Sequence, residues 1–456
     1  MIRTPEEGAP PLTQHSPAGF FRDRTITELA DRLRAGETSA VELTRAALRT
    51  IDELDGELNA FTAVDREGAV QAAEKADAEL AEGLDRGPLH GIPVAVKDII
   101  EVAGLPTAMG SAHFAEHVST SDAECVRRLR TGGAVLVGKT TTHEFAFGPT
   151  GDSAHRGPSR NPHDTTRITG GSSGGSGAAV AAGMVPLALG TDTGGSVRIP
   201  AALCGVVGFK PAYGAISTDG VFPLAQSLDH VGVLARTPQD CRTGYRVLAG
   251  LRSTPSGESG ETASIGWLDP GALHPTDPEI TRIARAALDV DGLAVREVGI
   301  RDPDVVHRGF LGIQFSEAYA NHAERVAEHP ELFTDDVLDR LRQAARTAGW
   351  QHVRALAARE EWRREVHELL SEVDLLATPT TCVVATELGR REIPVDGTAA
   401  DVRGALIGLT KPWNLAGVPA VSVPAGVLGG LPVGLQLVGR PGREDVLLAV
   451  AARIGG

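Results

Sequence analysis

A glycine-rich stretch between residues 170 and 211 most constrains what this chain can fold into. It reads GGSSGGSGAAVAAGMVPLALGTDTGGSVRIPAALCGVVGFKP. Glycine costs backbone entropy in a folded element, so glycines this dense indicate that the backbone approaches something closely. A flexible Gly/Ser linker is the alternative interpretation. Context disfavours a linker, because the stretch runs directly into the apolar residues from Ala178 to Gly190, whereas a linker joins polar surfaces.

The same stretch predicts alternating elements. Residues 178–182 indicate a helix of small residues, 185–189 a short buried strand, and 196–203 a second helix, with polar loops between them. Loop, helix, strand, loop and helix is the order in which α/β sites gather backbone N–H donors at helix N-termini. The sequence therefore predicts an α/β fold with a site built around these loops.

Two serines in the stretch are candidates for chemistry. Ser172 satisfies the G-x-S-x-G pattern of a nucleophile elbow. Ser196 ends the run Thr193-Gly194-Gly195-Ser196, whose N–H groups could converge as an oxyanion hole. A serine hydroxyl is a poor nucleophile until a base removes its proton. The residues of this stretch therefore do not decide which serine is the nucleophile. Either one needs a general base from another part of the chain.

Lys97 is the candidate base. The chain has only five lysines, and this one interrupts an apolar strand, GIPVAVKDII. Adjacent strand residues point to opposite faces, so Asp98 is poorly placed to pair with it. Desolvation among aliphatic side chains would lower its pKa from about 10.4 towards the range of a usable base. The alternative is a lysine that snorkels from the strand end to water.

Composition excludes several classes of function. The net charge of −15 argues against a nucleic-acid binder. Four cysteines without a CxxC pair predict a reducing, cytoplasmic location without disulfides. The uncharged run 412–439 is long enough to cross a membrane, but its prolines favour buried strands. No complete HExxH, P-loop or GxGxxG motif is present, so no metal, nucleotide or other cofactor is expected.

The domain organisation is predicted from texture along the chain. Residues 1–24 are predicted to form a loosely draped tail, and 25–456 one domain. Three outer helices follow the tail, at 25–35, from 39 onward and at 66–82, the first two opening with capping boxes. Residues 278–371 are helical and charged, and we expect them to form a lid over the site.

These motifs resemble those of the amidase signature hydrolases. The resemblance covers most of the chain and rests on GGSSGGSGAAVAAG, GTDTGGSVRIPAALCG, GIPVAVKD, VGKTTTHEF, SLDHVG, DLLATPT and LPVGLQLVGRP. It implies a single large α/β domain whose central mixed β-sheet is covered by helices on both faces. It also implies a triad with Ser196 as nucleophile, Ser172 as the bridging serine after a cis peptide bond, and Lys97 as base. The implied oxyanion hole is the backbone N–H groups of Thr193, Gly194, Gly195 and Ser196.

Further positions match the signature or depart from it. Asp192 and Arg198 match, and we expect them to fix the loop; Ser173 and Thr191 are expected to hydrogen-bond within it. Thr142-His143 stands where the family often has Met-Asp. We expect His143 to be a surface or hydrogen-bonded histidine without a catalytic role.

The resemblance implies hydrolysis of small-molecule amides through an acyl-enzyme on Ser196, extending to aryl esters and carbamates (urethanes). The alternative is the glutaminase subunit of a tRNA-dependent amidotransferase. A non-catalytic scaffold is disfavoured because all triad positions are filled. The segment 278–371 does not resemble the amidotransferase type, which favours a stand-alone amidase, monomeric or homodimeric, without direct nucleic-acid or membrane contact.

Overall fold

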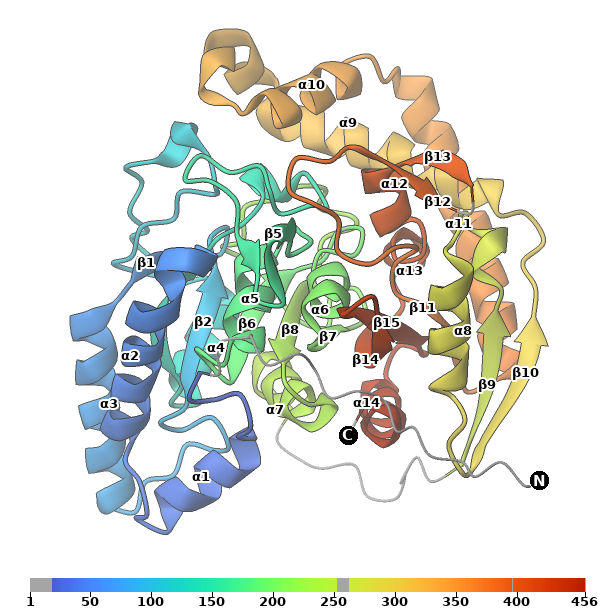
Figure 1. The fold of residues 1–456 in the computed structure, drawn as a ribbon. Coiled ribbons are helices and arrows are strands. Elements are labelled where there is room, and N and C mark those ends of the chain that lie inside the picture. The colour runs from blue at the N-terminus through green and yellow to red at the C-terminus, as the bar shows by residue number, and fades with distance from the viewer. Residues whose placement is uncertain (1–18, 252–261, 396, 456) are drawn as a thin grey trace.

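The computed structural model describes residues 19–251, 262–395 and 397–455 (Figure 1). Residues 1–18 of the predicted tail lie outside this range. Residues 19–24 are packed onto the domain, which corrects the predicted boundary at residue 24. Gly19 and Phe21 donate their N–H groups to the carbonyls of Ala182 and Gly183, both at 3.0 Å. The Phe21 ring is fully buried, and removing its large apolar surface from water stabilises the packed position of these residues.

The predicted N-terminal helices are confirmed. They are α1 (Ile26–Arg34), α2 (Ala40–Leu58) and α3 (Arg66–Ala81). Thr25 with Glu28 caps α1, and Ser39 with Glu42 caps α2, each as a reciprocal capping box.

An 11-stranded mixed sheet forms the centre of the described chain. In spatial order its strands are β1 (Phe61–Val64), β3 (Val135–Thr140), β2 (Pro93–Lys97), β6 (Leu187–Thr191), β8 (Val231–Ala235), β7 (Val207–Lys210), β14 (Ala420–Leu428), β15 (Leu431–Val438), β11 (Leu375–Pro379), β9 (Ala263–Leu268) and β10 (Leu293–Val298). Strand β2 runs parallel to both β3 and β6, whereas β6, β8, β7, β14 and β15 are successively antiparallel. The predicted strands at Lys97 and in the run 412–439 are confirmed.

Helices cover both faces of the sheet. A Cβ at Gly232 of β8 would meet Val197, at the start of α6 (Arg198–Cys204), whereas the next residue, Val233, contacts Gly244 of α7 (Pro238–Ala249). Because neighbouring strand residues face opposite sides, α6 and α7 lie on opposite faces. Helix α5 (Gly174–Ala181) packs beside α6, and α14 (Glu444–Ile454) beside α7. The predicted α/β domain with a covered mixed sheet is confirmed.

The sequence predicted that the segment 278–371 is helical, but the structure also contains a strand in it. Helix α8 (Pro278–Ala286) packs on β11, β14 and β15, and β10 adds an edge strand beside β9. The alternating residues of β10 are half exposed, so its hydrophobic pattern is weak. The rest of the segment is helical and forms α9 (Asp304–Glu328), α10 (Asp335–Ala344) and α11 (Gly349–Glu372). Helices α9 and α11 share a buried hydrophobic cluster with Leu268 of β9 and Leu376 of β11. Helices α9 and α10 lie at the top of the view in Figure 1.

The remaining elements are short. In the described part of the chain they are α4 (Glu124–Thr131), α12 (Val402–Ile407), α13 (Lys411–Ala416), β4 (Arg160–Asn161), β5 (Asp164–Ile168), β12 (Glu392–Val395) and β13 (Thr398–Asp401), with single-turn 3₁₀ helices at 112–114, 144–146, 270–272 and 330–332. Within the described ranges, no helix has the length and apolar character needed to cross a membrane.

Candidate active site

The carboxyl ends of β2 and β6 bring the candidate base to the glycine-rich loops. The two strands are parallel neighbours, and Lys97 and Thr191 are their last residues. Ligands of open α/β sheets bind at this edge of the parallel strands. The Lys97 Nζ atom lies 2.7 Å from the Ser172 hydroxyl and 2.7 Å from that of Thr191. Lys97 and Ser172 are both fully buried, so the lysine does not snorkel to water.

The surroundings of Lys97 favour its neutral form. Burial lowers its pKa from 10.5 to about 7, although the carboxylates of Asp192 and Asp229 act in the opposite direction. Asp98 pairs instead with Lys139, whose Nζ lies 3.3 Å from Asp98 Oδ1. This agrees with the strand alternation, which predicts that Asp98 is unavailable to Lys97. A buried lysine near neutrality has the properties of a general base.

The loop that carries Ser172 is fixed through its backbone. The Gly171–Ser172 peptide bond is cis. Gly171 N donates to the Pro149 carbonyl at 2.7 Å, and His143 N donates to the Ser172 carbonyl at 3.0 Å. These contacts leave the Ser172 hydroxyl for Lys97.

Ser196 lies next to this loop. Ser173 N donates to the Ser196 carbonyl at 3.1 Å. Within the part of the chain that the structure describes, no hydrogen bond joins the Ser172 and Ser196 hydroxyls. Ser196 is 8% exposed, whereas Ser172 is 0% exposed, so Ser196 is the more accessible of the two residues.

Ser173 and Thr191 hold the two loops together. The Ser173 hydroxyl donates to the Thr191 carbonyl, and Thr191 N donates back to it, both at 3.2 Å. The sequence predicted that both residues hydrogen-bond within the loop. The contact of the Thr191 hydroxyl with the candidate base was not predicted.

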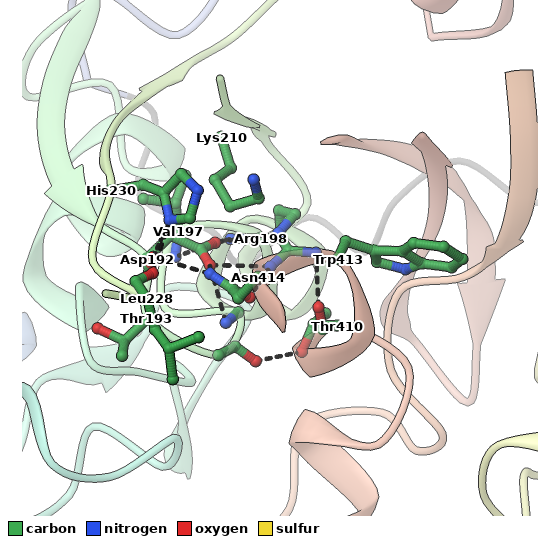
Figure 2. A network of polar contacts seen from close by, with 12 residues as sticks. Asp192, Thr193, Val197, Arg198, Lys210, Leu228, His230, Thr410, Trp413 and Asn414 are labelled. Carbon is green, nitrogen blue, oxygen red and sulfur yellow. Dashed lines mark hydrogen bonds and ion pairs between the residues drawn. The ribbon is translucent and has the colours of Figure 1, made fainter. Parts of the chain in front are cut away.

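Asp192 organises the turn that ends at Ser196 (Figure 2). Its carboxylate accepts the N–H groups of Gly195 at 2.9 Å and Val197 at 3.1 Å. Burial would raise its pKa, but Arg198 and Lys210 hold it below its usual range. The carboxylate is therefore charged, and charge-assisted hydrogen bonds fix the turn.

The structure corrects the predicted oxyanion set at one residue. Gly195 was expected to offer its N–H to an oxyanion, but that N–H is taken by Asp192. Among the described residues, the N–H groups of Thr193, Gly194 and Ser196 have no acceptor. Three donors therefore remain on the turn.

Arg198 holds the turn through its contacts with Asp192, which Figure 2 shows. Its guanidinium is fully buried and pairs with Asp192 through Nε at 3.0 Å and Nη2 at 2.8 Å. It also donates to the side-chain oxygens of Asn414 and Gln436, at 2.7 and 2.5 Å. A buried ion pair of this kind needs such additional hydrogen bonds to offset its desolvation.

Residues far along the chain complete the site, and no sequence pattern indicated most of them. The Thr410 hydroxyl donates to the Gly194 carbonyl at 2.6 Å, and Asn414 Nδ2 donates to the Asp192 carboxylate at 2.8 Å. Asp229 accepts the Thr193 hydroxyl at 2.6 Å. Asp229 lies in the SLDHVG motif, so that motif could have identified it.

His143 differs from the expectation of a surface or hydrogen-bonded side chain. It is fully buried, and neither ring nitrogen has a hydrogen bond to a described residue. Its Nε2 lies 3.3 Å from the Asp336 carboxylate without hydrogen-bond geometry. Burial lowers its pKa to about 3, so the ring is neutral at physiological pH. Among the described residues, no group of three His, Cys, Asp or Glu side chains could hold a metal ion.

Comparison with known proteins identifies the class. The amidase family profile matches residues 42–448. The chain is 37% identical to the A subunit of the glutamyl-tRNA(Gln) amidotransferase of Roseiflexus sp. (strain RS-1), covering 93% of this chain and 94% of that one. It is 37% identical to AtzE, the 1-carboxybiuret hydrolase subunit of Pseudomonas sp. (strain ADP), covering 92% and 96%. A crystal structure of an amidase superposes with a TM-score of 0.88 at 36% identity, covering 94% and 99%.

These matches and the fold define a hydrolase that acts on carbon–nitrogen bonds. The chain belongs to the amidase signature family.

Proposed function

We propose that this chain hydrolyses small-molecule amides through an acyl-enzyme on Ser196, with Ser172 as proton relay and Lys97 as general base. The observation that carries the proposal is the buried Lys97 Nζ, 2.7 Å from the Ser172 hydroxyl. A surface lysine would be fully charged at neutral pH and could not accept a proton.

The proposed acylation uses two proton transfers, whose net result is that Ser196 loses a proton and Lys97 gains one. Neutral Lys97 takes the proton of Ser172, and Ser172 takes that of Ser196 while Ser196 Oγ forms a bond to the substrate carbonyl carbon. The carbonyl π electrons move to oxygen, and the oxyanion accepts the free N–H groups of Thr193, Gly194 and Ser196. Loss of one such donor typically raises the barrier by about 2.7–4 kcal/mol.

Collapse of the tetrahedral intermediate breaks the C–N bond. The relay returns the proton to the leaving amine, and an ester remains on Ser196. Water gives a proton to the same relay and attacks the carbonyl carbon of this ester. The C–O bond to Ser196 then breaks, the relay returns the proton to Ser196 Oγ, and the acid leaves. Asp192 and Arg198 act through the loop by holding its turn, without touching the substrate.

Ser196 is preferred over Ser172 as the nucleophile on two observations. The Ser172 hydroxyl is fully buried and is occupied by Lys97. Ser196 is more accessible, and it lies on the turn whose unpaired N–H groups belong to Thr193, Gly194 and Ser196 itself. A fluorophosphonate probe should therefore add its mass at Ser196.

The labelling experiment needs three variants. Ser196→Ala should abolish labelling, Ser172→Ala should slow it strongly, and Ser371→Ala should not change it, since Ser371 is an exposed serine on α11. Labelling at Ser172 in the unmodified protein would overturn the assignment of roles. Lys97→Ala should abolish turnover, and unchanged activity would remove Lys97 from the mechanism.

The proposal extends to aryl esters and carbamates, because they require the same acyl transfer. A panel of primary amides, anilides, esters and carbamates, assayed with the unmodified protein and Ser196→Ala, tests this range. Turnover that survives in Ser196→Ala would reject the acyl-enzyme for that substrate.

A glutaminase subunit of an amidotransferase complex is the second candidate. The similarity to the glutamyl-tRNA(Gln) amidotransferase protein favours it, and the equal identity to a 1-carboxybiuret hydrolase protein does not. Glutaminase activity should be measured with the chain alone and with the partner subunits added. Activity that appears only in the complex would favour this candidate over a stand-alone amidase.

We further propose that the helices α9 to α11 of the segment 278–371 form the lid, in place of the whole segment that the sequence predicted.

We also propose that the protein works in the cytoplasm as a monomer or homodimer. All four cysteines are free and buried, which suits a reducing compartment. Sedimentation of the purified protein measures the oligomeric state, and a larger homo-oligomer would contradict this proposal.

A further inference from the structure

One side of helix α9 faces the candidate active site. Residues 310, 314, 317 and 321 lie on the same side at helical spacing. The tip of the Phe310 ring lies against the oxyanion turn, since a Cβ at Gly194 would come within 2.7 Å of Phe310 Cζ. The Glu317 carboxylate accepts the N–H and hydroxyl of Ser227, at 2.9 and 2.6 Å. Gln314 therefore lies between the part of α9 above Gly194 and the part above Ser227.

The other serine loop lies near the same turn of α9. The ring of Phe315 contacts that of Phe147, with 6.2 Å between centroids. Phe147 is two residues before Pro149, whose carbonyl accepts Gly171 N at 2.7 Å. The part of α9 that carries Gln314 is thus linked to the Ser196 loop through Phe310 and to the segment before the Ser172 loop through Phe315.

Gln314 has a buried side-chain oxygen without a hydrogen-bond partner among the described residues. The residue is 6% exposed, and Oε1 makes no hydrogen bond with any described residue. A buried acceptor left unpaired costs free energy, so such groups call for an explanation. Its neighbours on the same side are fully engaged: Phe310 packs on Gly194, and Asn321 donates to the carbonyls of Pro223 and Leu224 at 3.2 Å.

We propose that Gln314 is a specificity-determining residue that binds a second amide or ureido group in the acyl part of the substrate. The proposal rests on the function proposed above. A glutamine side chain offers one acceptor and two donors in a plane, and an amide or ureido group presents the complementary N–H and C=O. Oε1 would accept the substrate N–H, and Nε2 would donate to its carbonyl.

The acyl part is favoured over the leaving amine because of burial. The acyl group stays on Ser196 through both half-reactions, whereas the amine must leave to solvent before water enters. A partner that is only 6% exposed to solvent therefore suits the group that stays. A site built to hydrogen-bond a polar group rejects an apolar isostere strongly, because its own polar atoms remain unpaired.

The test compares succinamide with 4-methylpentanamide, in which an isopropyl group replaces the second amide at the same length. The unmodified protein should prefer succinamide by at least about tenfold in kcat/KM. Gln314→Met keeps the side-chain shape and removes the hydrogen bonds, so this ratio should fall to near one. Gln343→Met, at an exposed glutamine of α10, is the matched control and should keep the ratio.

A second measurement does not depend on turnover. Succinamide should protect Ser196 from the fluorophosphonate probe at lower concentration than 4-methylpentanamide does, and Gln314→Met should remove this difference. Labelling of Ser196 also shows that each variant is folded. Equal ratios in Gln314→Met and the unmodified protein, or no preference for succinamide in either assay, would overturn the role of Gln314. Absence of Ser196 labelling in the unmodified protein would instead reject the proposed function itself.

Discussion

Replacing Lys97 by methionine should abolish hydrolysis and change how the stability of the fold depends on pH. Lys97 is fully buried, and burial lowers its pKa from 10.5 to about 7 in the folded protein. In the unfolded chain the pKa returns to about 10.4. Between these values the unfolded state binds more protons than the folded state, so this lysine makes stability rise with pH across the window.

The size of the effect follows from the two pKa values. Each pKa unit corresponds to about 1.36 kcal/mol, and the folded lysine is half protonated near pH 7. Linkage then predicts that the unmodified protein gains about 2 kcal/mol of unfolding free energy relative to Lys97→Met between about pH 7 and pH 9. The lost hydrogen bonds to Ser172 and Thr191 shift the variant at both pH values alike, so they cancel in this difference.

Urea unfolding of both proteins at the two pH values measures the effect. Lys75→Met is the control, because the Lys75 side chain is 73% exposed and its removal should leave the pH dependence unchanged. If the unmodified protein and Lys97→Met lose or gain stability in parallel, the pKa of Lys97 is not depressed. The neutral base on which the mechanism depends would then be refuted.

Four further outcomes are expected. The kcat/KM for amide hydrolysis should rise about tenfold per pH unit below pH 7 and level off above it, because only neutral Lys97 accepts a proton; a flat profile between about pH 5 and 9 would contradict this. Asp192→Asn should lower the unfolding free energy by about 3–5 kcal/mol in urea, since Arg198 remains buried without its counter-charge, and Asp219→Asn on the surface should not. Thr410→Val, which removes the hydrogen bond to the Gly194 carbonyl, should lower kcat for amide hydrolysis by up to about tenfold; an unchanged kcat would show that the turn keeps its geometry without this bond. Phe21→Ala should cost about 3–5 kcal/mol by denaturant unfolding, and a loss below about 1 kcal/mol would mean that residues 19–24 do not stabilise the domain.

Local patterns predicted most of the fold. The capping boxes at Thr25 and Ser39 fix where α1 and α2 begin, because they satisfy N–H groups within one turn. The run around Lys97 predicted a buried strand with a desolvated lysine, since its flanking aliphatic residues leave the amine no route to water. Strand β10 was missed because its residues are half exposed and its pattern is set by one neighbour, β9.

The candidate site was predictable only where its residues are close in sequence. Ser172 and Ser196 lie in one stretch of sequence. Its order of loop, helix, strand, loop and helix was enough to predict that both serines lie on loops that precede helices. The partners of that stretch could not be found in this way. Thr410 and Asn414 bind the turn from 216 and 222 residues away, and no periodicity reports a contact at that separation.

The sequence by itself therefore determined the chemistry available: two hydroxyls, an amine among aliphatic residues, and glycines whose N–H groups are unhindered. Only the tertiary structure decided how these groups are used. It assigned the Gly195 N–H to Asp192, buried the ring of His143, and left Oε1 of Gln314 buried without a hydrogen bond to a described residue. The physical reason is that burial and hydrogen-bond partnership are properties of the packed neighbourhood, and distant segments supply most of that neighbourhood.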